Sequence, residues 1–316
     1  MSDLPVLVRR MERGAKNPAR VYLAGLVKSG RRTVDAQLRG VATMVGAKSI
    51  DEVPWHLLKH EHVVAIKTKT LELGKSPATV NLMLCGIRGA VRTAWNMGLM
   101  TAEELARIES VKGVKAFTEP KGRRIASGEL GAIMKGIKTE TPSGKRDAAI
   151  IALAYCGGLR RQEIASLQLQ NVNDLGEELE ITIKSGKGRK DRILFLNNGG
   201  ADALRDYLSV RGALPGSFFW SSLKNGKLIE DSKLTDQAIY ARIIRCAKVA
   251  GVKTLSPHDM RRSFVSDMLD SGVDISTVAA MAGHSSVSTT QRYDRRGDEA
   301  KKRAAKALHL PYRANT

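Results

Sequence analysis

A histidine and an arginine near the C-terminus have a spacing that suits a site for an anionic substrate. His258 and Arg261 lie three residues apart, so they share one face if their segment is helical. Ser256 suits an N-cap and Pro257 the first helical position, which predicts a helix beginning there. A guanidinium can bind phosphate oxygens with forked donors. Taken alone, such a pair is more often an ordinary surface pair.

A second helix is predicted to follow, and it ends beside two further reactive residues. Asp274 suits its N-cap, an apolar stripe at helical spacing runs to Met281, and Gly283 ends it. His284 emerges at that end, nine positions before Tyr293. A tyrosine hydroxyl can attack phosphorus and stay attached to it. Two helices and a turn can therefore bring these residues together with the preceding pair.

An arginine in the middle of the chain lies where a glycine turn meets a helix start. Gly157 and Gly158 end an apolar helix predicted over residues 147–155, and Arg160 opens the next helix. Backbone N–H groups at such a position also favour an anion. Glu163, three residues on, can orient Arg160 by a charge-assisted hydrogen bond. Judged alone, this motif is more often an exposed ion pair of little energetic worth.

A β-hairpin with a basic tip is predicted next. Apolar and polar residues alternate from Leu179 to Ile183, and a second strand spans residues 192–196. The tip, residues 185–190, holds Lys187 between two glycines, which allow close approach to another backbone and allow movement. Such a tip often serves only solubility, but on a DNA-binding protein it can be a finger inserted into a groove.

The charge of the chain points to a polyanionic partner. Lys and Arg number 52 against 32 Asp and Glu, a net +20. Nucleic acid is the leading partner, since neutralising phosphates releases counterions. An anionic membrane surface is a weaker alternative, because no basic amphipathic helix with an aromatic edge stands out. Aromatic residues make up only 4% of the chain, which disfavours a stacking platform for single strands and favours double-stranded DNA.

The composition is otherwise that of a soluble protein. With 316 residues and 42% hydrophobic content, the chain is long enough for two domains with buried cores. It contains no apolar run of about eighteen residues, and its N-terminus has no signal-peptide pattern. Cys85, Cys156 and Cys246 are isolated and match no metal-ligand spacing. We expect a cytoplasmic protein with incidental buried thiols.

The order of the predicted elements divides the chain into two domains and a linker. Residues 1–112 are predicted to be helical, residues 113–124 to be a basic linker, and residues 125–316 to form a second domain. The expected fold class is mainly α with a small β-sheet, the second domain being α+β. Helices of the first domain are predicted over 17–28, 33–45, 51–58, 61–73, 76–96 and 102–108. Those of the second are predicted from Ser127, over 147–155, 201–211 and 235–250, from Pro257 and Asp274 onward, and over 299–308, with a polar loop over 139–146.

Basic side chains outside these motifs are candidates for contact with a DNA backbone. They lie on polar helix faces of the first domain, in the linker and at the hairpin tip: Lys67, Lys69, Arg88, Arg92, Arg123, Arg124, Arg189 and Lys190. For the helical ones a solvated surface is an equally open interpretation. A basic linker would naturally follow a phosphate backbone.

Taken together, the reactive residues occur in the order of a known family. They are Arg160 in Gly-Leu-Arg-Arg-Gln-Glu, Lys187 in Gly-Lys-Gly-Arg-Lys, His258 and Arg261 in His-Asp-Met-Arg, His284 in Ala-Gly-His and Tyr293 in Gln-Arg-Tyr-Asp. Over residues 125–296 the sequence resembles the tyrosine site-specific recombinases, the phage integrase family. The first domain resembles the family's helical core-binding domain. Two departures touch no catalytic position: Arg262 stands where a His is common, and residues 194–196 lack the usual proline.

The resemblance implies DNA strand exchange through a 3′-phosphotyrosyl intermediate, with Tyr293 as the nucleophile. It assigns Lys187 as general acid for the departing 5′-oxygen, His258 to proton transfer at the tyrosine, and His284 to a hydrogen bond with the phosphate. Because a tyrosine hydroxyl has an ordinary pKa of about 10, it needs a base or strong transition-state stabilisation. Arg160 and Arg261 can stabilise the charge that builds on the phosphate oxygens. No metal, ATP or other cofactor is expected, since arginines supply the charge that Mg²⁺ supplies elsewhere.

The resemblance also implies an assembly on DNA. The two domains would form a C-shaped clamp around the duplex, and four protomers would join two sites, as in DNA integration and other rearrangements of mobile genetic elements. The segment beyond Tyr293 would dock on a neighbouring protomer. Two other classes stay open. A type IB topoisomerase uses the same residue types, but the helical first domain and short length favour a recombinase. A non-catalytic DNA-binding protein is disfavoured because all the chemical positions are intact.

Overall fold

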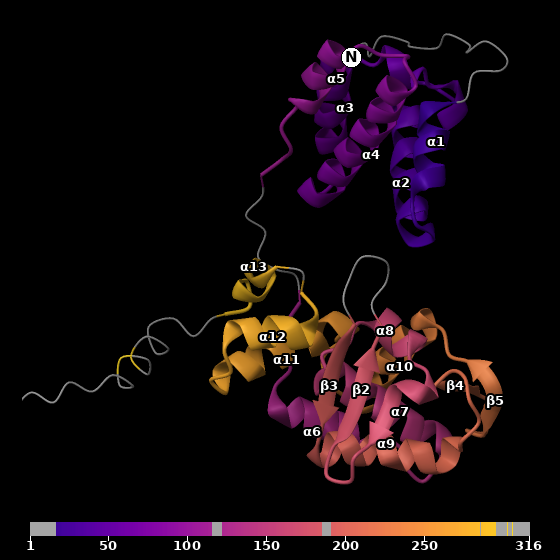
Figure 1. Cartoon of the computed structure of the whole chain (residues 1–316), viewed down its shortest axis with the longest axis vertical. Coiled ribbons are helices and arrows are strands. Elements are labelled where there is room, and N and C mark those ends of the chain that lie inside the picture. The colour runs from indigo at the N-terminus through magenta and orange to yellow at the C-terminus, as the bar shows by residue number, and fades with distance from the viewer. Residues whose placement is uncertain are drawn as a thin grey trace, which may run out of the picture. The chain divides into compact units, whose positions relative to one another are not determined.

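The chain divides into two compact units, Met1–Thr118 and Glu119–Thr316, shown in Figure 1. The structure, a computed structural model, describes residues 17–115, 122–184, 191–284 and 286–294, together with positions 302 and 305. The division falls within residues 113–124, where the sequence predicts a linker. The helix predicted over 299–308 lies outside the described residues except for those two positions.

The first unit is helical throughout its described part. Its elements are α1 (Pro18–Gly25), α2 (Lys28–Met44), the 3₁₀ turns η1 (Ile50–Glu52) and η2 (Trp55–Leu57), α3 (His60–Glu72), α4 (Pro77–Asn96) and α5 (Ala102–Glu109). Helix α4 is the centre of the packing, because α1, α2, α3 and α5 all contact it. Its inner face buries Val80, Leu84 and Ile87 completely or nearly so, in one apolar cluster with Leu38 and Ile66. The apolar stripes in the sequence therefore form the core of a helical bundle.

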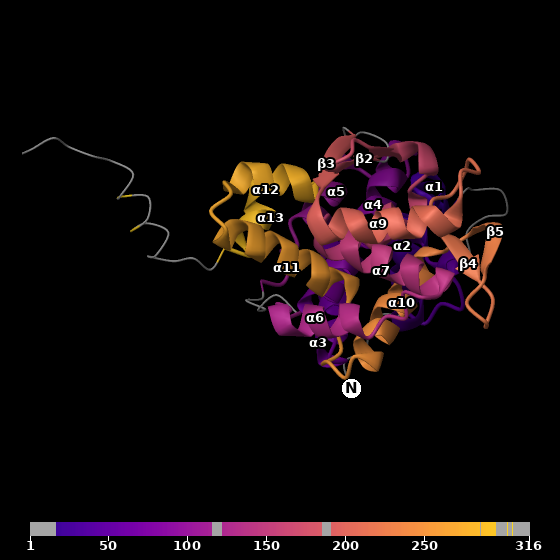
Figure 2. The same cartoon turned by 90° about the horizontal axis from the view of Figure 1, so that it is seen from below.

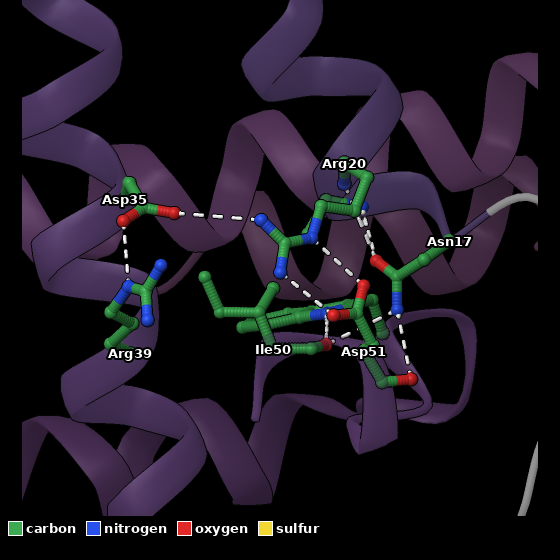
Figure 3. A network of polar contacts seen from close by, with 8 residues as sticks. Asn17, Arg20, Asp35, Arg39, Ile50 and Asp51 are labelled. Carbon is green, nitrogen blue, oxygen red and sulfur yellow. Dashed lines mark hydrogen bonds and ion pairs between the residues drawn. The ribbon is translucent and has the colours of Figure 1, made fainter. Parts of the chain in front are cut away.

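A polar network fixes the start of α1 against η1 (Figure 3). Asn17 caps α1 by accepting a hydrogen bond from the Ala19 N–H at 3.0 Å, while its amide donates to the Ile50 carbonyl at 3.2 Å. Arg20 binds both carboxylate oxygens of Asp51, at 2.8 and 2.7 Å. The network ties two segments about thirty residues apart, so it orders the entry of the chain into the bundle.

The helix predicted over residues 51–58 is wrong. The structure has two 3₁₀ turns there, separated by Val53 and Pro54. Val53 is extended, with φ −79° and ψ 121°, as expected of a residue whose α conformation the following proline disfavours. Trp55 is fully buried and its indole N–H donates to the Ile50 carbonyl at 3.0 Å. Burial of the indole therefore stabilises the two 3₁₀ turns in place of one helix.

The second unit packs helices around a small antiparallel sheet. Its elements are α6 (Ser127–Lys135), α7 (Pro142–Tyr155), α8 (Arg161–Ser166), η3 (Leu169–Asn171), β1 (Val172–Asp174), β2 (Leu179–Ile183), β3 (Arg192–Leu196), α9 (Asn198–Arg211), β4 (Trp220–Ser222), β5 (Leu228–Lys233), α10 (Asp236–Val249), α11 (Pro257–Asp270), α12 (Ile275–Ala282) and α13 (Val287–Gln291). The three-stranded sheet has the order β1-β2-β3, and β4 pairs with β5 alone. The apolar helix α7 is at the core and contacts α8, α9, α10 and α11.

The predicted hairpin is confirmed, whereas three strands were not predicted. β2 and β3 pair antiparallel, with Leu179 opposite Leu196 and Ile183 opposite Arg192. β1 has three residues and β5 carries Glu230 and Asp231, so neither shows the alternation of apolar residues that marks a half-buried strand.

Several helix starts differ from the sequence prediction: α2 begins at Lys28 rather than at residue 33, α9 at Asn198 rather than at residue 201, and α7 and α6 differ as well. The polar loop predicted over 139–146 is wrong from residue 142, because α7 begins at Pro142 and Thr141 caps it through the Gly144 N–H at 3.0 Å. The N-cap of α6 is Ala126 rather than Ser127, and Glu129 accepts the Ala126 N–H at 3.1 Å. The signal at α7 is a first-turn proline, and the signal at α6 is a capping glutamate.

α11 and α12 begin where the sequence predicts, and α12 ends at the predicted glycine, whereas α13 was not predicted. Ser256 caps α11 by accepting from the Asp259 N–H at 3.3 Å, and Asp274 caps α12 through two N–H groups at 2.9 Å. Gly283 ends α12 in the left-handed conformation, with φ 63°. α11, α12 and α13 lie side by side in both views (Figures 1 and 2), and α12 also packs on β3. Within the described residues, no helix combines the length and apolar character needed to cross a membrane.

Candidate active site

The C-terminal turn of α12 gathers three arginines from distant parts of the chain. The carbonyls of Met281, Ala282 and Gly283 accept hydrogen bonds from Arg192 Nε at 3.0 Å, Arg261 Nη2, and Arg160 Nη2 at 3.0 Å, respectively. The last carbonyls of a helix have no partner within the helix and carry its negative dipole end. The end of α12 is therefore an acceptor surface that brings three positive charges together beside His284.

Glu163 links two of these arginines. Arg192 binds both of its oxygens, while Arg160 donates to it from Nη1 and from the backbone N–H, both at 2.8 Å. Burial works to raise the pKa of the Glu163 carboxyl, but hydrogen bonds from Arg192 and Arg160 and their charges lower it to about 2. The predicted bond between Glu163 and Arg160 is present, and Arg160 is the N-cap of α8. Glu163 is thus ionised and orients Arg160.

Arg261 is buried and held on two sides. It is 4% exposed, and its Nη1 donates to the Gly158 carbonyl at 2.6 Å in addition to the bond to Ala282. Burial, together with the positive charges of Arg160 and Arg192, lowers the pKa of Arg261 to about 10, so the group stays charged at neutral pH. A desolvated guanidinium of this kind interacts strongly with any anion that reaches it.

Tyr293 lies within reach of the histidine on α11. Its Oη is 3.3 Å from His258 Nε2. Its ring stacks on that of His284, with centroids 6.4 Å apart and an interplanar angle of 19°. The guanidinium carbon of Arg262 lies 5.7 Å from the centroid of the Tyr293 ring. The structure therefore brings the tyrosine and both histidines of the predicted set together, in one unit with Arg160 and Arg261.

Both histidines favour the neutral form. Burial lowers the pKa of His258, and the charge of Arg261 adds to that effect. Burial and the charges of Arg261 and Arg160 lower the pKa of His284 to about 4. His284 Nδ1 lies 2.8 Å from the hydroxyl of Thr290, which is fully buried on α13. A neutral imidazole can accept a proton, and His258 is placed to do so at the Tyr293 hydroxyl.

A pocket of about 350 Å³ opens beside these groups, on the side of α8 and α10. Its lining includes Arg160, His258 and Arg261, with Arg161 and Tyr240 beside them. Each guanidinium has five N–H donors. Within the described part of the chain, the side chains of Arg160 and Arg261 each use two donors on protein acceptors. Other donors of both arginines can therefore bind an anion in the pocket.

The remaining predicted residues lie either outside the described part of the chain or in contacts of their own. Lys187, Arg189 and Lys190 lie outside the described residues. The other basic candidates have acceptors within their own unit: Lys67 donates to the Lys112 carbonyl at 2.8 Å, Lys69 pairs with Glu72 at 3.5 Å, Arg88 donates to the Val111 carbonyl, Arg92 binds Glu109, Arg123 binds Glu129, and Arg124 binds Asp267 and Asp270. Their contact with DNA stays a prediction.

Sequence reasoning did not find Arg192 or Thr290, nor the contact of Arg262 with the Tyr293 ring. A signal for Arg192 exists, because strand alternation places it on the inner face of β3 with Leu194 and Leu196, where a charge needs a partner. Thr290 offers no comparable signal, since a threonine on a five-residue helix is unremarkable in sequence.

Comparison with known proteins gives one consistent answer. Residues 123–299 match the model of the phage integrase family. Tyrosine recombinase XerC of Treponema denticola is 34% identical over 235 residues, covering 69% of this chain and 73% of that protein. Tyrosine recombinase XerD of Lacticaseibacillus casei is 30% identical over 226 residues, covering 69% of this chain and 72% of that protein.

Two solved structures share the fold. The Tn1549 transposon integrase in complex with transposon right end DNA has a TM-score of 0.66 at 17% identity, covering 93% of this chain and 99% of that one. A lambda integrase tetramer bound to a Holliday junction has a TM-score of 0.64 at 13% identity, covering 89% of this chain and 77% of that one. At such identities the likeness is one of fold alone. With the family match and the XerC relative, however, the conclusion is plain: the chain belongs to the phage integrase family, the tyrosine recombinases, as its motifs implied.

Proposed function

We propose that this tyrosine recombinase cuts and rejoins double-stranded DNA at specific sites with Tyr293 as its nucleophile, through a 3′-phosphotyrosyl intermediate. The observation that carries the proposal is the 3.3 Å approach of the Tyr293 hydroxyl to His258 Nε2. The two arginines that converge on the end of α12, Arg160 and Arg261, add the charge that a phosphate requires. The net +20 of the chain suits a DNA partner.

In the cleavage step one bond to phosphorus forms as another breaks. The Tyr293 oxygen attacks, His258 accepts its proton, and the bond from phosphorus to the 5′-oxygen breaks. The leaving 5′-oxygen takes up a proton from a general acid. Because the new phosphotyrosyl bond keeps the energy of the phosphodiester, rejoining by the reverse reaction needs no ATP.

The arginines act on the charge of the transition state. As phosphorus becomes five-coordinate, negative charge builds on its two non-bridging oxygens. Arg160 and Arg261 are already fixed by Glu163 and by carbonyls, so little reorganisation is needed when the charge appears. A single lost donor of this kind costs roughly 10²–10³ in rate in other enzymes. His284, held by Thr290, is proposed to add a hydrogen bond to the same oxygens.

The proposed general acid is Lys187. The support is its place in the motif order between Arg160 and His258. Lys187→Ala should slow cleavage of an ordinary DNA substrate, while a substrate with a good 5′ leaving group should restore the rate. Absence of that rescue would remove Lys187 from the role.

The proposed working form is a tetramer that joins two DNA sites. The support is the solved lambda integrase tetramer on a Holliday junction, which shares the fold of this chain. Loss of the residues beyond Arg296 should leave single-site binding largely intact and impair assembly. Normal recombination by that shortened chain would count against a role of this segment.

The deciding experiment is covalent trapping. A duplex carrying a candidate site is nicked near the cleavage position, so that the cut fragment diffuses away and the protein stays attached to the 3′ end. We expect an adduct resistant to denaturant with the wild type and none with Tyr293→Phe. An undiminished adduct in Tyr293→Phe would refute the assignment. Joining of two separate sites, rather than relaxation of a plasmid without site preference, distinguishes a recombinase from a topoisomerase.

A further inference from the structure

Arg262 is a buried cation that contacts both the ring of the nucleophile and the last residues of the predicted linker. It is 5% exposed. Its Nη1 donates to the Gly122 carbonyl at 2.8 Å, and its guanidinium carbon lies 5.7 Å from the centroid of the Tyr293 ring. That distance lies within the range at which a cation and an aromatic ring attract each other. The proposed reaction so far gives Arg262 no task.

The Gly122 carbonyl is itself held in place against α11. The Arg123 N–H donates to Asp259 Oδ1 at 2.9 Å, and the Ile125 N–H donates to the Ser263 hydroxyl at 2.8 Å. Gly122 has φ 111°, and a Cβ at this position would lie 2.4 Å from Asp259 Oδ1. Only glycine permits this approach. The guanidinium of Arg262 is therefore anchored by a carbonyl that is itself fixed on α11.

We propose that Arg262 is a positioning residue for the nucleophile: it holds the Tyr293 ring beside His258 and stabilises the negative charge that the phenol oxygen gains as it loses its proton. The inference rests on the proposed function, since it gives Tyr293 a reason to need positioning. A cation over the ring attracts the neutral phenol weakly and the phenolate more strongly. It therefore favours the transition state more than the resting site.

The same charge acts on the proton acceptor. Arg262 is among the cations that lower the pKa of His258, which keeps the imidazole neutral. The groups that face His258 come from several elements: Arg261, Asp259 and Arg262 on α11, Arg160 and Arg161 at the start of α8, Tyr240 on α10, and Tyr293 after α13. Arg262 also lies 5.7 Å from the centroid of the Tyr293 ring. Its removal should therefore change both partners of the proton transfer.

The test compares Arg262→Gln and Arg262→Lys in single-turnover cleavage of the nicked substrate, with DNA affinity measured separately. For Arg262→Gln we expect a rate roughly 5- to 30-fold lower at saturating DNA, which corresponds to the loss of a desolvated cation–ring contact. DNA affinity should stay unchanged. The acid limb of the pH–rate profile should move to higher pH, because His258 gains a proton more easily. Arg262→Lys keeps a cation and should hold the limb at the wild-type position.

A matched control separates positioning from stability. Arg211 is likewise buried, at 2% exposed, donates to the Phe218 carbonyl at 3.2 Å, and lies 4.4 Å from the Trp220 ring. Arg211→Gln should lower the melting temperature, yet leave the cleavage rate per folded molecule and the pH profile unchanged. If Arg262→Gln does not fold, Gly122→Ala displaces the anchor while keeping the charge, and it should lower the rate per folded molecule.

The outcomes are distinct. The inference would be overturned if Arg262→Gln cleaved at the wild-type rate with the wild-type acid limb. If Arg262→Gln does not fold, the same result in Gly122→Ala would overturn it. In both cases the proposed function would stay intact. Loss of rate without movement of the limb in Arg262→Gln would restrict the role to holding the ring. Absence of any adduct in the wild type would instead refute the proposed function.

Discussion

Arg192 binds both carboxylate oxygens of Glu163, with Nη1 3.0 Å from Oε1 and Nη2 2.8 Å from Oε2. The two side chains lie 29 residues apart in sequence and come from β3 and α8. Glu163 in turn bonds Arg160, so the strand that leads away from the hairpin tip fixes the arginine that faces the pocket. The hairpin is thus joined to the active site by a fork of charge-assisted hydrogen bonds.

Glu163→Gln should weaken both the fold and the reaction. The substitution removes the charge between Arg160 and Arg192 and leaves two partly buried cations uncompensated. We expect a loss of about 1–3 kcal/mol in the free energy of unfolding, measured by urea denaturation at pH 7. Cleavage should fall at least 10-fold. The exposed Glu177→Gln is the control and should change neither quantity.

The effect of Glu163→Gln should depend on acid pH. Because the folded protein lowers the pKa of this carboxyl from 4.5 to about 2, its contribution to stability is complete above about pH 4.5. It is lost as the pH falls toward 2. The difference between wild type and variant should therefore shrink over that window, and a constant difference would contradict the ionised state.

The cleavage rate should have an acid limb whose midpoint lies below pH 6.5. The pKa of His258 is lowered from its ordinary 6.5, so the neutral imidazole persists at neutral pH and is lost only on further acidification. Single-turnover rates measured between pH 5 and 8 should show a plateau at the alkaline end and reach half of it below pH 6.5. His258→Gln should lower that plateau by roughly 10²–10⁴ and remove the limb. A wild-type midpoint above pH 6.5 would speak against His258 as the proton acceptor.

Thr290→Val should loosen His284. Valine keeps the shape of the fully buried side chain but removes the hydroxyl that lies 2.8 Å from His284 Nδ1. We expect a loss of about 1–3 kcal/mol in stability, since the partner nitrogen stays partly buried without its bond. The cleavage rate should fall several-fold, and Thr290→Ser should restore it. Thr289→Val, at the preceding and less buried position, serves as the control. Equal effects of the two valines would remove Thr290 from the site.

Gly283→Ala should disturb the arginines as well as the backbone. Its φ is 63°, and an added Cβ would lie 2.8 Å from Arg192 Nη1. Gly251 has a φ of 68° with no atom within 4 Å of such a Cβ. Gly251→Ala should therefore cost only the strain of the left-handed conformation, about 1 kcal/mol. Gly283→Ala should cost more and also reduce cleavage, whereas matching melting temperatures and rates would show that Arg192 yields freely.

Local signals in the sequence were enough to predict the helices that carry the site. A serine cap with a following proline starts α11, and an aspartate cap and a glycine bound α12. These features act within a few residues, so they can be interpreted without the fold. The family order then predicted which residues come together. The bond between Arg160 and Glu163 was predictable for the same reason, since both lie in one turn.

The contacts that order the site were beyond sequence reasoning because they join distant segments. Arg192 reaches the Met281 carbonyl across 89 residues, and Arg262 reaches Gly122 across 140. The spacing of apolar residues along the sequence does not predict which strand packs against the end of which helix. Short or polar elements such as β1 and β5 were missed because their residues lack the apolar alternation on which strand prediction depends.

The contact between Tyr293 and His258 lies within a single polypeptide. Neither the tyrosine nor the histidine has to come from a neighbouring copy. Two separately damaged chains, one Tyr293→Phe and one Arg160→Gln, would therefore fail to complement each other when mixed, because neither contains an undamaged centre. In an assembly that mixes wild-type and variant copies, each copy would cleave the DNA strand that it binds only if its own active-site residues are intact.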